Sequence, residues 1–123
     1  MIYDLGSGEG TALITAAKEF GARGVGVEID PFRAWQSKVA VMLAGVSDKV
    51  EIKRENFFEV DVSDATVVFM YLIPRTLVKL REKFLKELKP GTRVVTFVYK
   101  MDLPLYAQDE KAEMYVYEIP KKK

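Results

Sequence analysis

The sequence predicts an α/β fold with a mostly parallel sheet and an antiparallel hairpin near the C-terminal end. Three observations lead to this prediction. Short apolar segments alternate with helical patterns, a glycine-rich turn follows the first apolar segment, and an acidic residue follows the second. The 123 residues contain no internal repeat or linker, so we expect a single domain, 1–123.

The first strand and helix flank the glycine-rich turn. Ile2–Leu5 is an apolar, strand-like start, and residues 10–20 carry apolar positions at helical spacing. Gly21 is the expected C-terminal stop of that helix, because glycine adopts the left-handed conformation that ends many helices. Residues 24–29 (GVGVEI) then predict a second, buried strand.

A second helix start follows this strand directly. Asp30 is suited to cap a helix, and Pro31 is suited to its first position because that N–H needs no partner. The pattern predicts a helix that ends near Gly45 and continues through the apolar residues Trp35, Val39 and Met42.

The second half continues the alternation of strands and helices. Val50–Lys53 alternates as a half-exposed strand near an edge, and the continuous apolar run 66–71 predicts a central parallel strand. Pro74 opens a helix, and a strand is expected at 93–99. The helix has an apolar stripe of Leu77, Leu80, Phe84, Leu85 and Leu88. Residues 103–108 and 113–119 are expected to form the antiparallel hairpin.

Composition excludes several kinds of chemistry. The chain has no cysteine and no histidine, which excludes disulfides, thiolate nucleophiles and Ser-His schemes, and no metal site is predicted. With 19 basic and 18 acidic residues, the charge gives no argument for nucleic acid as a partner. No apolar run is long enough to cross a membrane, and no signal peptide is seen, so a cytoplasmic location is expected. A single Asn and two Gln favour a thermophilic source.

The glycine-rich turn has the pattern acidic-x-Gly-x-Gly-x-Gly. It begins at Asp4, and its glycines are Gly6, Gly8 and Gly10. Glycine allows sharp turns and close approach of a ligand, and the helix start that follows offers unpaired N–H donors. The pattern is not the dinucleotide-binding Gly-x-Gly-x-x-Gly, because its sixth position is Thr11, and it lacks the Lys-Ser/Thr ending of a phosphate-binding loop. A turn without a ligand is the alternative.

Glu28 favours a ligand over an empty turn. It follows Gly10 by eighteen residues and stands near the end of the second predicted strand. An acidic side chain in this place accepts hydrogen bonds from both hydroxyls of a ribose. Together the glycine loop and Glu28 predict a site for a nucleoside cofactor.

Four stretches resemble one family, the seven-stranded, Rossmann-like methyltransferases that depend on S-adenosylmethionine (SAM). Residues 4–10 (DLGSGEG) match the first motif of that family, and residues 26–30 (GVEID) match the second. With residues 54–61 (RENFFEVD) and 86–95 (KELKPGTRVV), the sequence is similar to archaeal broad-specificity protein-lysine methyltransferases and their mitochondrial relatives. The resemblance implies a Rossmann-like three-layer sandwich that binds SAM and releases S-adenosyl-L-homocysteine.

The resemblance also implies roles for individual residues. Asp4 would hold the methionine ammonium of SAM, and the three glycines would let the backbone pass close to the aminoacyl part. Glu28 would bind the ribose hydroxyls, and Ile29 and Phe57 would pack on the two faces of adenine. Asn56 would meet the adenine edge.

Some of these residues have a structural alternative. Asn56 is also typical of a turn, and the neighbouring rings of Phe57 and Phe58 are equally consistent with core packing. Tyr71, at the end of the fourth predicted strand, is the best candidate to contact the substrate amine, but buried strand aromatics are just as common.

The leading hypothesis is a SAM-dependent N-methyltransferase that acts on exposed lysines of proteins. Residues 70–74 lack the Asn/Asp-Pro-Pro-aromatic motif of enzymes that methylate nucleic-acid bases. Small-molecule or RNA methylation is the alternative within the superfamily. A SAM-binding fragment without catalysis is a third hypothesis, because the glycine loop begins at residue 6 and the usual N-terminal segment of the family is expected to be missing. The sequence does not indicate an oligomeric state.

Overall fold

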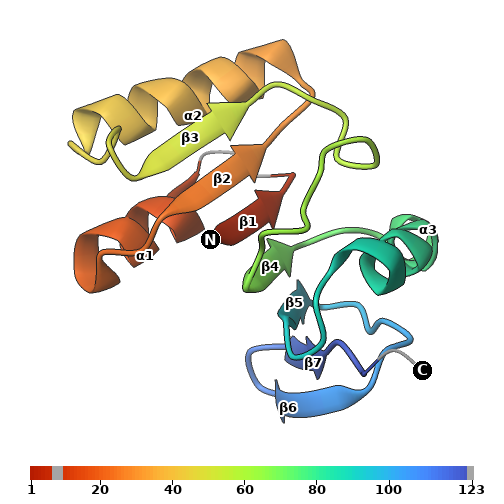
Figure 1. Ribbon diagram of the computed structural model, residues 1–123. Coiled ribbons are helices and arrows are strands. Elements are labelled where there is room, and N and C mark those ends of the chain that lie inside the picture. Colours follow the sequence, from red (N-terminus) through yellow and green to blue (C-terminus); the bar gives the residue numbers. More distant parts are fainter. Residues whose placement is uncertain (7–9, 122–123) are drawn as a thin grey trace. The chain divides into compact units, whose positions relative to one another are not determined.

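The computed structural model describes residues 1–6 and 10–121, which divide into two compact units, Met1–Val60 and Asp61–Lys123. Each unit is an α/β structure (Figure 1). Within the described residues, no helix has both the length and the apolar character needed to span a membrane.

The first unit has the order β1, α1, β2, α2, β3. Its elements are β1 (Ile2–Leu5), α1 (Thr11–Phe20), β2 (Gly24–Val27), α2 (Pro31–Leu43) and β3 (Val50–Lys53). The three strands are parallel, with β2 in the centre, so β3 lies at an edge as predicted. The sequence extends the second strand to residue 29, but β2 ends at Val27, and Glu28 lies directly beyond it.

The predicted helix signals of this unit are confirmed. The Asp30 carboxylate accepts hydrogen bonds from the backbone N–H groups of Phe32 at 2.9 Å and Arg33 at 3.0 Å, and Pro31 occupies the first turn. Gly21 has a φ of 66° and donates its N–H to the carbonyl of Ala17, which ends α1.

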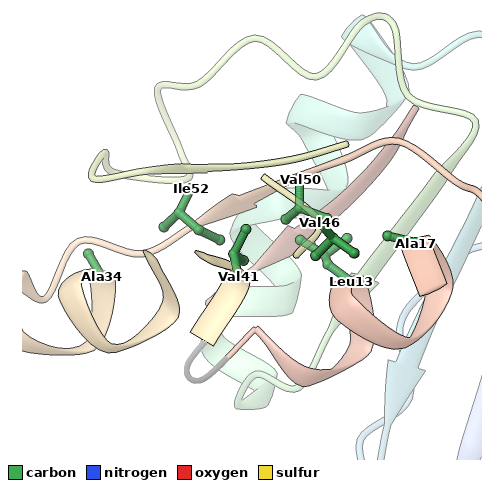
Figure 2. Close-up of a cluster of buried hydrophobic side chains, with 7 residues drawn as sticks. All are labelled: Leu13, Ala17, Ala34, Val41, Val46, Val50 and Ile52. Carbon is green, nitrogen blue, oxygen red and sulfur yellow. The ribbon is translucent and has the colours of Figure 1, made fainter. Parts of the chain in front are cut away.

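The core of the first unit lies between its two helices and the strands. Figure 2 shows side chains from α1, α2 and β3 meeting in one apolar cluster. The cluster consists of Leu13, Ala17, Ala34, Val41, Val46, Val50 and Ile52. The buried face of α2 is thus formed by Ala34, Ser37 and Val41, whereas Trp35 and Met42 are exposed. Both sets have helical spacing, so the pattern alone did not distinguish the inner face from the outer one.

The second unit pairs two parallel strands with an antiparallel hairpin. Its elements are β4 (Val67–Met70), α3 (Pro74–Glu87), β5 (Arg93–Phe97), β6 (Leu105–Asp109) and β7 (Met114–Glu118). β4 runs parallel to β5, β7 pairs with β5 in the antiparallel sense, and β6 pairs with β7, so the predicted hairpin is confirmed. The predicted start of α3 at Pro74 is also confirmed, and α3 buries Leu77, Leu80 and Phe84.

Gly24 is a position where packing requires glycine. A Cβ atom there would lie 2.6 Å from Cδ2 of the buried Leu13 and 3.1 Å from the carbonyl oxygen of Ile2. We expect Gly24→Ala to lower the free energy of unfolding by about 1–3 kcal/mol, because the core must shift to accept the methyl group. Urea denaturation measures this loss.

A double-mutant cycle tests the physical reason for that loss. Leu13→Val shortens the side chain that the added methyl group would meet, so Gly24→Ala should cost less in the Leu13→Val background than in the wild-type chain. Equal costs in the two backgrounds would contradict the steric explanation.

Candidate cofactor site

The carboxyl ends of β1 and β2 lie side by side in the first unit. Leu5 is the register partner of Val27, and the pairing continues one step further because the N–H of Gly6 donates to the carbonyl of Val27 at 2.8 Å. Gly6 has a φ of 74°, a conformation that costs other residues about 1–2 kcal/mol. The chain therefore turns away from the sheet at the edge where parallel α/β structures bind their ligands.

Two acidic residues meet at this edge. Asp4 is 9% exposed and Glu28 is 8% exposed. Burial, together with the negative charge of Glu28, raises the pKa of the Asp4 carboxyl to about 6. A pair of acids held out of water in this way suits a ligand that brings a positive charge or several hydroxyl donors.

Hydrogen bonds from neighbouring backbone position Glu28. Its N–H donates to the carbonyl of Lys53 at 3.0 Å, which extends the pairing of β2 with β3. Its side-chain Oε2 accepts the N–H of Asp30 at 3.2 Å. Since Asp30 also caps α2, the start of that helix and the orientation of the Glu28 carboxylate are coupled.

Ile29 presents an apolar surface next to Glu28. Ile29 is 57% exposed, and its carbonyl accepts a hydrogen bond from Nε of Arg54 at 3.4 Å. Arg54 was not among the predicted site residues. The signal for it is positional: Arg54 directly follows β3, and the register with β2 brings it beside Ile29.

Asn56 and Phe57 come shortly after the end of β3 in the sequence. The Oδ1 atom of Asn56 accepts the N–H of Phe58 at 2.9 Å, and its carbonyl accepts the N–H of Glu59 at 2.9 Å. The turn interpretation of Asn56 is therefore confirmed. Among the described residues, its amide nitrogen has no hydrogen-bond partner, so two donors are open to a ligand.

The ring of Phe57 is only partly buried. Phe57 is half-buried and Phe58 is exposed, and their ring centroids lie 5.0 Å apart at a tilt of 59°. The core-packing interpretation is thus wrong for Phe58. An apolar ring held half in water is a surface on which a flat ligand can pack.

The glycine-rich turn enters α1 through Gly10, which has a φ of 76° and is the N-cap residue. Among the residues that the structure describes, no side chain caps this helix start, and the first turn of α1 contains no acid. Its N–H groups are therefore available to an anionic group. Gly8 lies outside the described residues.

Tyr71 belongs to the second unit, whereas the other predicted site residues belong to the first. It follows the last residue of β4, Met70, and it is 66% exposed. The alternative interpretation, a buried strand aromatic, is therefore wrong. Within the described residues, no group of three acidic side chains is arranged to hold a metal ion.

Comparison with known proteins identifies one matching family. Residues 4–104 match the family described as the ANTKMT methyltransferase domain. A protein-lysine N-methyltransferase of Saccharolobus islandicus (strain REY15A) is 45% identical over 102 residues, which are 82% of this chain and 63% of that protein. An adenine nucleotide translocase lysine N-methyltransferase of Mus musculus is 34% identical over 96 residues, or 77% of this chain and 42% of that protein.

A solved structure confirms the predicted fold class. It is described as an RNA methyltransferase from Salinibacter ruber in complex with S-adenosyl-L-homocysteine, and it superimposes with a TM-score of 0.92 at 41% identity. The match covers 99% of this chain and 82% of that chain. This chain spans less than two thirds of the length of the archaeal and mouse relatives above.

The pKa of Asp4 leads to a prediction about stability. A carboxyl whose pKa is raised from 3.8 to about 6 in the folded chain stabilises the fold fully below its unfolded pKa, and this contribution is lost as the pH rises through 6. Between about pH 4 and pH 7 the loss is about 2 kcal/mol. Asp4→Asn should remove this part of the pH dependence and should make the ligand-free chain more stable at neutral pH.

Urea denaturation of both chains across this pH range measures the effect. The difference between wild type and Asp4→Asn isolates Asp4 from the other carboxylates, because these are common to both chains. A difference that does not change with pH would contradict the raised pKa.

Proposed function

The chain belongs to the ANTKMT methyltransferase domain family, and on this premise we propose that it transfers methyl groups from SAM to lysine side chains of proteins. The observation that carries the proposal is the acidic pair Asp4 and Glu28 at the carboxyl edge of β1 and β2, next to the glycine turn. The protein-lysine relative of 45% identity supports the choice of substrate.

The aminoacyl part of SAM fits Asp4 of β1 and the start of α1. The Asp4 carboxylate binds the methionine ammonium. The positive charge of the ammonium favours the ionised form of Asp4 and so opposes the desolvation that raises the pKa of Asp4. Gly6 and Gly10 let the backbone approach closely, and the same role is proposed for Gly8. The uncapped N–H groups of α1 suit the methionine carboxylate.

The nucleoside part fits the residues after β2 and β3. Glu28, held by the N–H of Asp30, accepts hydrogen bonds from the ribose hydroxyls. Ile29 and Phe57 present the apolar surfaces on which adenine packs. The amide nitrogen of Asn56 donates to an acceptor on the adenine edge.

The methyl transfer requires little acid–base or nucleophilic chemistry from the protein's side chains. SAM supplies a methyl group on a positively charged sulfur, which is a good leaving group. The lysine nitrogen forms its bond to the methyl carbon as the carbon–sulfur bond breaks, so the chain must hold the amine in line and neutral. Desolvation near the site lowers the pKa of the substrate lysine, whose proton leaves to water, and Tyr71 guides the amine.

RNA is the competing substrate, because the Salinibacter ruber relative is described as an RNA methyltransferase. Two features of this chain favour protein. The net charge is +1, and residues 70–74 (MYLIP) lack the motif of base methyltransferases. A SAM-binding chain without catalysis stays the third hypothesis. The cytoplasmic location and the thermophilic source stay predictions from composition.

Calorimetric titration with SAM tests the cofactor site. We expect saturable binding that Glu28→Gln weakens by about ten-fold or more, since the variant loses charge-assisted hydrogen bonds to the ribose. Glu51→Gln is the matched control, because Glu51 lies on β3 and is exposed. If the folded wild-type chain does not bind SAM, the proposal is wrong, because methyl transfer requires bound SAM.

Labelling with methyl-tritiated SAM tests the substrate and Tyr71. We expect label in protein lysines, and we expect Tyr71→Ala to lower kcat by about ten-fold while SAM affinity is unchanged, because Tyr71 touches only the substrate. Label that enters RNA or small molecules would support the alternative. SAM binding without transfer of label would support the non-catalytic fragment.

A further inference from the structure

A small cavity of about 140 Å³ lies within the second unit. One wall is a face of α3, formed by Pro74, Leu77, Val78 and Arg81. The other wall is the segment Lys100–Asp102, which leaves the carboxyl end of β5. None of the roles proposed above uses this cavity.

The cavity lies at the edge of the sheet where parallel strands end. Its two walls follow β4 and β5, which are parallel neighbours with Met70 opposite Thr96. Pro74 comes only three residues after Tyr71, so their Cα atoms are at most about 11 Å apart. An extended substrate segment covers this distance in about three residues.

The wall after β5 is held in place by hydrogen bonds. Met101 donates its N–H to the buried hydroxyl of Tyr117 at 2.8 Å, and Nε of Arg81 donates to the carbonyl of Asp102 at 2.7 Å. The chain reaches this wall through Val98, whose φ of 70° is rare for a β-branched residue. The N–H of Val98 donates to the carbonyl of Glu113 at 2.6 Å, which helps to hold this conformation.

Apolar side chains and three charged residues, Arg81, Lys100 and Asp102, line the cavity. Leu77 and Met101 are buried, and Val78 at the mouth is 71% exposed. Arg81 is paired with Asp102 and Glu82. Lys100, in contrast, has no carboxylate partner among the described residues, and its Nζ lies 5.4 Å from the centroid of the Tyr115 ring.

Size and charge together define what the cavity can receive. An apolar cavity of about 150 Å³ is large enough to bind a benzene molecule, so this cavity accommodates a side chain of leucine size. The unpaired ammonium of Lys100 attracts a carboxylate next to that side chain. A matching ligand therefore combines an apolar side chain with a neighbouring acidic one.

We propose that this cavity is a recognition pocket for the protein substrate, which receives a leucine side chain about three residues from the target lysine while Lys100 pairs with an adjacent glutamate. The proposal rests on the proposed function for its target lysine. The pocket is preorganised by Tyr117 and Arg81, so binding does not require the wall to rearrange.

The test uses short lysine peptides and the chain bound to S-adenosyl-L-homocysteine. Fluorescein-labelled peptides carry Leu-Glu about three residues before or after the lysine, and the comparison peptides carry Ala-Gln in the same places. Binding is measured by fluorescence anisotropy and needs no turnover. We expect one of the Leu-Glu peptides to bind about ten-fold tighter than its Ala-Gln partner.

Three variants test whether the cavity itself recognises the Leu-Glu peptide. Val78→Trp fills the mouth of the cavity from an exposed helix position and should abolish the preference for Leu-Glu. Lys79→Trp is the matched control at the next exposed position, which does not line the cavity, and it should keep the preference. Lys100→Gln should lower the preference for Leu-Glu over Ala-Gln without abolishing it, because the contact of the leucine side chain remains.

Equal binding of the two kinds of peptide would overturn the proposal that the cavity is a recognition pocket. A preference for Leu-Glu that survives Val78→Trp would overturn it as well. Binding of an unstructured RNA oligonucleotide that depends on Lys100, without binding of any peptide, would also overturn it. The proposed function fails differently: the Leu-Glu peptide would then bind with the expected preference, but methyl-tritiated SAM would transfer no label to its lysine.

Discussion

The parallel pairing of β1, β2 and β3 is the constraint on which the cofactor site depends. Its register places the carboxyl ends of the three strands together and carries the hydrogen bonding one step beyond each strand, from Gly6 to Val27 and from Glu28 to Lys53. A slip of one residue would turn Asp4 to the opposite face of the sheet. The register is maintained by the apolar cluster between the helices and the strands, in which β3 contributes Val50 and Ile52.

The acidic pair places a cost on the ligand-free protein. Asp4 is buried beside Glu28, and its raised pKa shows that the folded chain disfavours its charge. A ligand that brings a positive charge reverses this preference, since the carboxylate then has a partner in a region with little water. A site of this kind lowers the stability of the empty protein and raises its affinity for a cationic ligand through the same interaction.

The features that the sequence predicts correctly are those that a local rule decides. Asp30 and Pro31 start α2 because capping and a fixed φ act within one turn, and Gly21 ends α1 for an equally local reason. Which face of a helix is buried does not follow from the helical spacing of its apolar residues. The spacing of Trp35 and Met42 is as helical as that of Ala34 and Val41, and only the packing against β3 shows which set is buried. The same limit applies to Tyr71, since a strand residue and a residue just beyond the strand look alike in sequence.

The sequence by itself determined the order of strands and helices, the glycine turn and the acidic residue after the second strand, because each depends on residues that are close along the chain. Only the tertiary structure showed that Arg54 meets Ile29, that Asp4 and Glu28 are buried together, and that α3 and the segment after β5 enclose a cavity. These features join residues that are distant in sequence. Their geometry depends on strand register and on the unusual backbone at Val98, and no local propensity encodes either one.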